Sequence, residues 1–241
     1  MKGKIFGIGV GPGDPELLTL KAVATLQKCD VIAVPKAGKT KTAFNIIKDY
    51  VQGKELLECV FAMENDMSKR RAARQIVTHN IIRFLSEGKT VGFITLGDPT
   101  TYSTYMYIHS AIADMGFDAE IIPGITSFAA AAAALGVALC EDNEPLLIIP
   151  AGHNVGTEEL LSYPGNKVIM KSGENLARVL EELKARGYES RTKIASRVTQ
   201  EGECLYHDIE AFEKSPETGY FTIAIVKEKL TEHESKSGGV K

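Results

Sequence analysis

The stretch KIFGIGVGPGDPELLTLKA, residues 4–22, decides the fold class. Residues Ile5 to Val10 are apolar and predict a strand, which runs directly into a loop with alternating glycines at positions 9, 11 and 13. Glycine has no Cβ and tolerates positive φ, so such a loop lets backbone approach a bulky ligand. Two prolines delay the next helix until about Thr19, a good N-cap. A dinucleotide fingerprint needs G-x-G-x-x-G opening directly into a helix, so the pattern predicts a ligand loop of another kind.

Strand-like and helix-like segments alternate through the first half of the chain, which predicts an α/β unit with a largely parallel sheet. The candidate strands are Lys4–Val10, Val31–Val34, Glu55–Val60, Val91–Thr95 and Ala119–Ile122. The candidate helices carry apolar faces at helical spacing and end at Gly53, Gly88 and Gly116; the last of them is expected over Tyr102–Met115.

The second half of the chain contains more strand-like segments and fewer helix-like segments between them, which predicts a mixed sheet. An alanine-rich helix is expected over Ser127–Leu135 and a long amphipathic helix over Glu174–Arg186. The candidate strands are Leu146–Ile149, Lys167–Met170, Lys193–Val198, Cys204–Ile209 and Tyr220–Val226. The expected organisation is an N-terminal α/β domain (1–123), a C-terminal α/β domain (124–230) and a flexible tail (231–241), with the active-site cleft between the two domains.

Bulk properties narrow the class of protein. The chain has 241 residues and a formal net charge of −3, which argues against nucleic acid as a partner. The N-terminus predicts a strand rather than a signal peptide, and the longest apolar run, Phe128 to Cys140, is too short to span a bilayer. The expectation is a cytoplasmic protein that does not engage a membrane.

The four cysteines are widely scattered and lack C-x-x-C spacing, so we expect reduced, structural thiols and no bound metal. They are Cys29, Cys59, Cys140 and Cys204.

Three glycine-containing loops follow predicted strands: GVGPGD after the first, TLGDP (95–99) after the fourth and PGITS (123–127) after the fifth. Open α/β sheets bind ligands beyond the carboxyl ends of their strands, so these loops are expected to converge on one edge. The alternative is that each loop is only a turn, because Gly, Pro, Asp and Ser favour turns.

Taken together, GVGPGDPELLTLKA, TLGDPTTYSTY (95–105) and PGITSFAAAAAALG (123–136) resemble the tetrapyrrole methylase family in their order and spacing. Members of that family are S-adenosylmethionine-dependent enzymes of cobalamin and sirohaem synthesis. GDPTTYSTY is most similar to the branch that methylates C-20 of precorrin-2 or its cobalt complex. The resemblance implies S-adenosylmethionine as methyl donor, a tetrapyrrole acceptor and a homodimer.

The resemblance also implies site residues. The residues that it assigns to the donor pocket are Pro12, Leu96, Gly97, Asp98, Tyr102, Ile125, Thr126, Ser127, Met170, Lys171, Thr222 and Ile223, with Ala224 as an alternative to Ile223. Those expected to bind the substrate are Gly11, Gly13, Asp14, Lys36, Lys39 and Tyr105. Tyr102 and Tyr105 could instead be ordinary core aromatics.

The acceptor of this family bears many carboxylates, so basic residues should line its binding surface. Lys36, Lys39 and Lys41 are candidates, and so are Arg70, Arg71 and Arg74 of KRRAAR (69–74), although arginines on an exposed helix face are usually only solvated. Relatives that methylate uroporphyrinogen III carry Tyr-Asp-Arg after the second strand. This chain has Val34-Pro35-Lys36 there, which favours the C-20 branch.

No residue in the sequence identifies itself as the catalytic base. His153 is the best functional histidine candidate, whereas His79 and His109 are expected to pack within helices and His207 lies on a predicted strand. Three alternatives stay open: methylation at another ring position, a nucleotide-dependent α/β oxidoreductase, and a tetrapyrrole-binding protein without turnover. The oxidoreductase predicts an acidic residue at the end of the second strand, where this chain has Pro35-Lys36.

Overall fold

The chain forms two compact units, residues 1–126 and 127–241, each built around its own five-stranded sheet. The structure is a computed structural model, and it describes residues 2–36, 42–61, 66–152, 156–217, 219 and 221–229.

The sheet of the first unit is entirely parallel, with strand order β3-β2-β4-β1-β5. Its strands are β1 (Lys4–Gly9), β2 (Val31–Lys36), β3 (Glu55–Val60), β4 (Thr90–Thr95) and β5 (Asp118–Ile122). The central strands β1, β2 and β4 are apolar almost throughout because helices cover both faces of the sheet. The predicted parallel sheet is confirmed.

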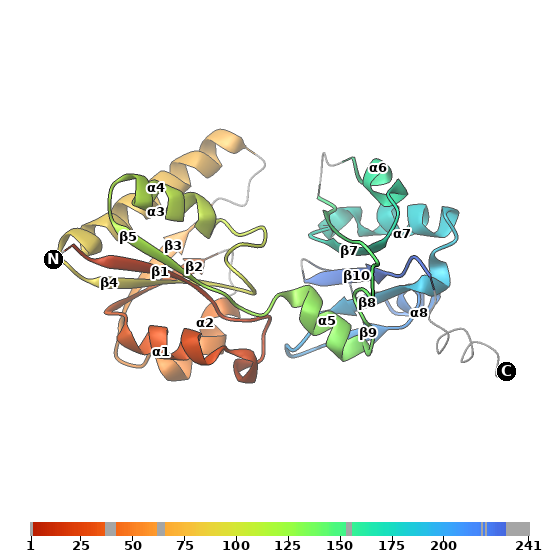
Figure 1. Ribbon diagram of the computed structural model, residues 1–241, viewed down its shortest axis with the longest axis horizontal. Coiled ribbons are helices and arrows are strands. Elements are labelled where there is room, and N and C mark those ends of the chain that lie inside the picture. Colours follow the sequence, from red (N-terminus) through yellow and green to blue (C-terminus); the bar gives the residue numbers. More distant parts are fainter. Residues whose placement is uncertain are drawn as a thin grey trace. The chain divides into compact units, whose positions relative to one another are not determined.

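Two helices cover each face of this sheet, as Figure 1 shows. They are α1 (Leu20–Lys28) with α2 (Thr42–Ile47) on one face and α3 (Met67–Ser86) with α4 (Tyr105–Asp114) on the other; short 3-10 turns lie at Pro15–Leu17 and Lys48–Tyr50. The α1 helix begins where the sequence predicts, because the Thr19 hydroxyl accepts a hydrogen bond from the Ala22 amide at 3.1 Å.

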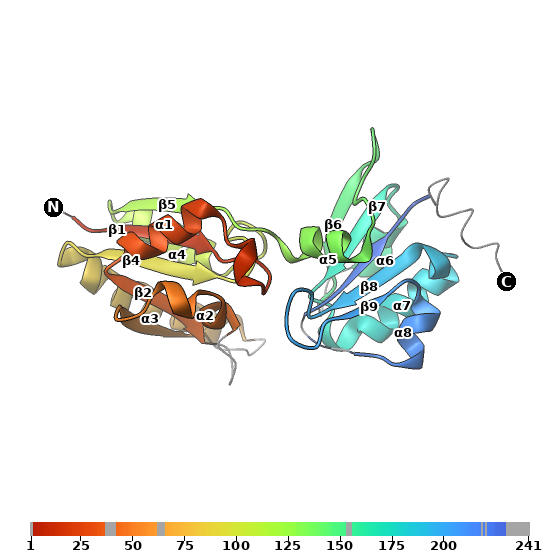
Figure 2. The ribbon, with the colours of Figure 1, turned by 90° about the horizontal axis from the view of Figure 1, so that it is seen from below.

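The second unit has a mixed sheet of order β6-β7-β10-β8-β9, in which only β6 and β7 pair in parallel (Figure 2). Its strands are β6 (Leu146–Pro150), β7 (Asn166–Met170), β8 (Thr192–Ser196), β9 (Cys204–Tyr206) and β10 (Thr222–Val226). Every residue of β7 and of β10 is buried, which places both strands in the middle of the unit.

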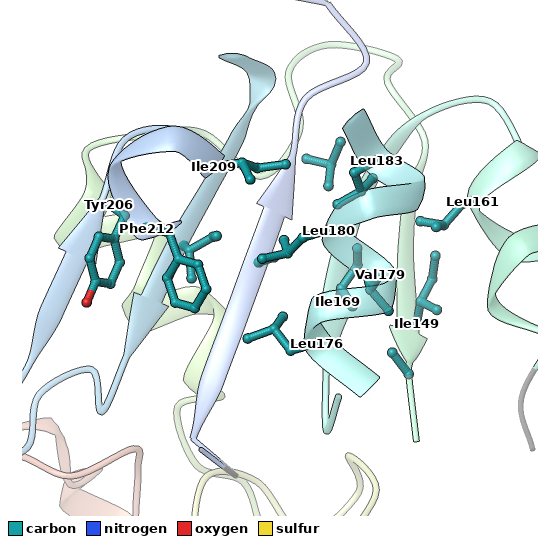
Figure 3. Close-up of a cluster of buried hydrophobic side chains, with 14 residues drawn as sticks. Ile149, Leu161, Ile169, Leu176, Val179, Leu180, Leu183, Tyr206, Ile209 and Phe212 are labelled. Atoms are coloured by element: carbon teal, nitrogen blue, oxygen red, sulfur yellow. The ribbon is translucent and has the colours of Figure 1, made fainter. Parts of the chain in front are cut away.

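Helices cover both faces of this second sheet as well. They are α5 (Ser127–Leu135), α6 (Thr157–Ser162), α7 (Leu176–Ala185) and α8 (Ile209–Lys214), with 3-10 turns at Gly173–Asn175 and Glu189–Arg191. The alanines of α5 pack on one face, and α6, α7 and α8 build the larger core on the other. Figure 3 shows Leu176, Leu180 and Leu183 of α7 within that core, together with Ile169 of β7 and Phe212 of α8.

Three sequence predictions need correction. The helix expected over Tyr102–Met115 begins only at Tyr105, because Tyr102 adopts a positive φ of 50°. The strand expected over Cys204–Ile209 ends at Tyr206. There the Asp208 side chain caps a helix instead, accepting a hydrogen bond from the Ala211 amide at 2.6 Å, so α8 starts at Ile209.

Strand β8 stops at Ser196 rather than Val198, because Arg197 has a φ of +52°. Strand β10 begins at Thr222 rather than Tyr220. The expected tail, 231–241, lies outside the described residues. Among the helices that the structure describes, none is long and apolar enough to cross a membrane.

Candidate functional site

Three loops meet at the carboxyl edge of the first sheet. Strands β4, β1 and β5 are neighbours and run parallel, with Gly9 opposite Thr95 and Ile8 opposite Ile122. Their carboxyl ends therefore lie side by side, and the loops that follow them are contiguous. We call residues 9–14, 95–100 and 123–126 together the three-loop edge.

Backbone hydrogen bonds join the first two of these loops. The Val10 amide donates to the Thr95 carbonyl at 2.9 Å, which extends the ladder past the end of both strands. Gly11 and Gly97 then form an isolated bridge: the Gly97 amide donates to the Gly11 carbonyl at 2.7 Å and the Gly11 amide to the Gly97 carbonyl at 3.3 Å. Both glycines have positive φ, 75° and 72°, which explains why glycine stands at these two positions.

The third loop packs directly on the backbone of the other two. A Cβ added at Gly124 would lie 2.2 Å from the Gly97 carbonyl oxygen and 2.8 Å from the Gly9 Cα. A Cβ at Gly9 would lie 2.5 Å from the Gly124 nitrogen. No side chain fits at Gly9 or Gly124, so glycine is needed at these two positions for the loops to come this close.

Asp98 fixes the second and third loops to each other. One carboxylate oxygen accepts hydrogen bonds from the Thr100 amide, at 2.8 Å, and from the Thr100 hydroxyl; the other accepts from the Gly124 amide at 2.9 Å. Asp98 is only 7% exposed. Its carboxylate is therefore largely used in holding the loops together, and its side chain serves the site chiefly through their geometry.

The residues expected to bind substrate from the first loop have mainly backbone surfaces to offer. Pro12 is buried, and Gly13 is half-buried. The Asp14 side chain accepts a hydrogen bond from the Glu16 amide at 2.8 Å and caps the 3-10 turn that follows. The glycine and proline backbone of this loop, more than the Asp14 carboxylate, is therefore what the edge presents to a ligand.

The basic candidates are dispersed. Lys36 ends β2 and pairs with Glu58 on the neighbouring strand, Nζ to Oε2 3.0 Å. Lys39 and Lys41, like His153, lie outside the described residues. Arg70, Arg71 and Arg74 lie in the first half of α3.

The two tyrosines of the GDPTTYSTY segment have different surroundings. Tyr102 is 44% exposed and follows the second loop in a left-handed backbone conformation, which is rare for a tyrosine and typical of functional sites. Tyr105 is fully buried, packs against Phe93 with ring centroids 5.2 Å apart, and its hydroxyl lies 3.1 Å from His109 Nδ1. Burial raises the pKa of Tyr105. Tyr105 is thus a core aromatic, and its burial argues against the predicted contact with substrate.

In the second unit, the expected pocket residues gather at one edge of the sheet. β10 runs antiparallel to β7 and β8, with Ala224 opposite Ile169 and Thr222 opposite Ser196. The carboxyl end of β7, at Met170 and Lys171, therefore lies at the same edge as the start of β10 at Thr222 and Ile223. Lys171 has a φ of +56°, so the backbone turns sharply where β7 ends.

The hydroxyl pair after Pro123-Gly124 stands at the start of a helix. The first unit ends at Thr126, and α5 begins at Ser127. Ile125 and Thr126 continue the third loop from Gly124. The first turn of a helix leaves backbone N–H groups outside the helical ladder, so this segment offers donors as well as hydroxyl groups.

Sequence reasoning missed residues whose environment depends on packing. The Thr95 hydroxyl, at the end of β4, is buried and has no hydrogen-bond partner among the described residues. Ser196 lies at the edge of the second sheet, its hydroxyl 2.9 Å from that of Thr222, and Arg197 beside it has a positive φ. No sequence signal marks these residues, apart from their place directly before or within loops at strand ends.

The histidines and cysteines of the described residues offer no cluster of three or more metal-ligating side chains. His109 contacts Tyr105, and His207 is exposed after β9. Burial raises the pKa of the Cys29 and Cys59 thiols to about 12, which disfavours thiolate chemistry at either.

The three-loop edge offers mainly backbone groups to a ligand. Gly11 and Gly97 have no Cβ and adopt positive φ, so the backbone at these positions permits close approach. The chemistry such an edge supports is binding and orientation of a ligand by backbone groups. It carries no nucleophile activated by a base.

The family model and the similar proteins of known name all point to one family. The family model described as Tetrapyrrole (Corrin/Porphyrin) Methylases matches residues 4–210. A probable cobalt-precorrin-2 C(20)-methyltransferase of Methanocaldococcus jannaschii is 37% identical over 93% of this chain and 96% of its own length. The cobalt-precorrin-2 C(20)-methyltransferase of Salmonella typhimurium is 30% identical over 95% of this chain and 98% of its own.

Solved structures share the fold at lower identity. The cobalt precorrin-4 methyltransferase CbiF is 22% identical, with a TM-score of 0.74 over 93% of this chain and 94% of its own. A uroporphyrin-III C-methyltransferase from Thermus thermophilus, in complex with S-adenyl homocysteine, is 20% identical, with a TM-score of 0.72 over 94% of this chain and 98% of its own.

Proposed function

Because the chain belongs to the tetrapyrrole (corrin/porphyrin) methylase family, we propose that it transfers a methyl group from S-adenosylmethionine to C-20 of cobalt-precorrin-2 or of metal-free precorrin-2 in cobalamin biosynthesis. The observation that carries this choice of ring position is the naming of full-length relatives: those from Methanocaldococcus jannaschii and Salmonella typhimurium are both C(20)-methyltransferases. A Sinorhizobium relative, 30% identical over 93% of this chain, is named as the precorrin-2 enzyme.

The three-loop edge is the proposed donor site in the first unit. Bound S-adenosylmethionine would supply an activated methyl group as a sulfonium. Leu96, Gly97 and Asp98, with Ile125 and Thr126, would hold the donor mainly by backbone contacts. The hydrogen bonds that join Gly11 to Gly97 and Asp98 to Gly124 support this assignment, since they set the loops in place before the ligand arrives.

Residues of the second unit are also proposed to contact the donor. Ser127 at the start of α5 would extend the donor contacts, and Met170, Lys171, Thr222 and Ile223 would line the donor from the edge of the second sheet. The substrate would lie against Gly11, Gly13, Asp14, Lys36 and Lys39. Tyr102, exposed and strained beside the second loop, would pack against either ligand.

Methyl transfer to carbon is an in-line displacement, so the main contribution of this chain is to hold donor and acceptor in line. Positioning of this kind can lower a barrier by several kcal/mol. The proposal names no catalytic base.

The test is a product analysis with carbon-13 methyl-labelled S-adenosylmethionine and precorrin-2, with and without cobalt. The proposal expects one labelled methyl group, assigned by NMR to C-20, and the cobalt dependence identifies the preferred substrate. Label at another ring position would replace the proposed specificity. Binding of the tetrapyrrole without any transfer would support a non-enzymatic binding protein. The proposal also includes a cytoplasmic homodimer, and sedimentation equilibrium of the purified chain checks the dimer.

A further inference from the structure

A groove runs between α3 and α4 on the outer surface of the first unit. Its volume is about 900 Å³, and it is lined along α3 from Met67 to Ile82 and along α4 from Tyr107 to Met115. Both helices cover the same face of the sheet and pack against each other (Figure 1). At 1.5 Å per residue, the α3 wall is about 22 Å long. None of the residues assigned to the donor site lines it.

The groove is basic in a protein that is acidic overall. α3 contains five lysines and arginines and no aspartate or glutamate, whereas the whole chain has a formal net charge of −3. Two of those arginines, Arg71 and Arg74, line the groove, and no carboxylate does. A cation left without a carboxylate neighbour attracts an anion from solution.

The two guanidinium groups differ in how they are held. Arg74 stacks on the Tyr107 ring, with its guanidinium carbon 4.1 Å from the ring centroid, and its Nε donates to the Arg70 carbonyl at 3.3 Å. Arg71 is exposed and forms no ion pair with any described residue. The two positions are three residues apart on one helix face, which places their Cβ atoms about 5–6 Å apart. Two guanidinium groups carried at this Cβ spacing can both contact acidic groups of one ligand.

Ser68, Gln75, Thr78 and His79 add polar groups to the groove, and the remaining lining residues are Met67, Ile82, Tyr107, Ala111 and Met115. Met67, Tyr107 and Met115 are 68%, 64% and 57% exposed, which is unusual for such large side chains gathered on one face. Ile82 is the last residue of α3 that lines the groove, and Ala111 lines it from α4. The groove therefore combines exposed apolar side chains with a pair of arginines.

We propose that the α3–α4 groove binds a small organic anion with a flat apolar body and two carboxylates or sulfonates about one helical turn apart. The Arg71 and Arg74 guanidinium groups hold its acidic groups, and Tyr107 and Met115 cover its apolar body. The charge disfavours a second copy of this chain at the same place, because a twofold contact would bring four guanidinium groups together without a carboxylate. This site is distinct from the three-loop edge and does not depend on the proposed reaction.

The experiment uses the full chain and the fluorescent probe anilinonaphthalene sulfonate, with naphthalene tetracarboxylate as competitor. The double variant R71Q/R74Q should bind the probe at least about tenfold more weakly, because its single sulfonate loses both guanidinium partners, and the competitor, which carries several carboxylates, should lose at least as much affinity. Arg83→Gln is the matched control: it removes one charge from the same helix outside the groove and should change the affinity less than about twofold. Glutamine forms helices well, and circular dichroism confirms that each variant is folded.

A second, uncharged probe separates the electrostatic contribution to binding from the hydrophobic contribution. Phenylnaphthylamine, the uncharged analogue, should bind wild type and R71Q/R74Q equally, while Tyr107→Ala weakens both probes. Equal affinity of R71Q/R74Q and Arg83→Gln for the anionic probe would overturn the proposal. So would sedimentation data in which Tyr107→Ala abolishes self-association while probe affinity is unchanged, since the face would then be an interface between copies.

Discussion

Replacing Asp98 with asparagine removes a bridge between two loops while changing the shape of the side chain very little. In the wild type, each carboxylate oxygen accepts a hydrogen bond from a backbone amide, Thr100 on one side and Gly124 on the other. Asparagine has one oxygen and one NH₂ group. Whichever way the amide is turned, one of the two backbone N–H groups then faces another donor.

The cost can be worked from these contacts. A hydrogen bond to a charged acceptor contributes about 1.5–3 kcal/mol, and Asp98 is 7% exposed, so solvent replaces little of it. We expect Asp98→Asn to lower the free energy of unfolding of the first unit by about 3 kcal/mol. With a urea m-value of about 2 kcal/mol/M, the unfolding midpoint moves down by about 1.5 M.

The assay is urea unfolding of the full chain, with the transition of each unit followed separately by hydrogen exchange, because two units need not unfold as one. Asp66→Asn is the matched control: Asp66 caps α3, and asparagine caps helices as well as aspartate, so the expected change is under about 0.5 kcal/mol. Under the proposed function, Asp98→Asn also weakens binding of S-adenosylhomocysteine. Equal unfolding midpoints for Asp98→Asn and Asp66→Asn would refute the reasoning.

Three further predictions concern groups that the proposed site does not use. Iodoacetamide should alkylate the exposed Cys140 quickly and Cys29 and Cys59 slowly, as read by peptide mass spectrometry of the native chain. The reason is that burial raises the pKa of the Cys29 and Cys59 thiols to about 12. Rapid labelling of either buried thiol would contradict this. Burial opposes ionisation of the Glu228 carboxylate, but hydrogen bonds from Lys167 and Tyr188 outweigh it and hold the pKa below its ordinary value. The Glu228 carboxylate therefore stabilises the fold above about pH 4.3, and this stabilisation is lost as the pH falls through the pKa of the folded state. Glu228→Gln should make the free energy of unfolding less dependent on pH in the acid range, as measured by urea unfolding at a series of pH values. Lys167 is fully buried, and its Nζ lies 2.6 Å from the Gly165 carbonyl and 3.1 Å from the Glu228 carboxylate. Lys167→Met should therefore lower the free energy of unfolding by about 2 kcal/mol. This value is below that of a fully buried ion pair because Glu228 is partly exposed. The double variant with Glu228→Gln should recover part of that loss; a double variant no more stable than the single one would show that the pair is not coupled.

Local signals carried much of the fold. The helix α5 begins and ends where the alanine-rich pattern predicts, and Gly88 and Gly116 follow their helices with positive φ. The alternation of strand-like and helix-like segments was enough to predict the parallel sheet of the first unit. Its central strands could be recognised because buried parallel strands are continuous apolar runs in the sequence. These features depend on neighbours in sequence, which is why sequence reasoning reaches them.

The errors lie where distant contacts decide the structure. α8 is six residues long and owes its stability to burial of Ile209 and Phe212 against the sheet, so its short pattern resembled the end of a strand. Tyr102 was expected inside a helix, but the turn after Asp98 holds it in a left-handed conformation.

The site shows the same division. The three loops could be predicted to converge, since their strands are parallel and adjacent. The use of the Asp98 carboxylate to hold Gly124, and the unsatisfied hydroxyl of Thr95, depend on the exact packing of loops far apart in sequence. Tyr105 has the right motif position for a ligand contact, yet it is buried because Gly7 leaves room for its ring.

The central claim is that the three-loop edge holds the methyl donor, and a crystal structure of the chain soaked with S-adenosylhomocysteine tests it most directly. The account predicts the nucleoside within hydrogen-bond distance of backbone at residues 96–98 and 125–127. Electron density for the nucleoside at any other place, with these loops empty, would contradict it.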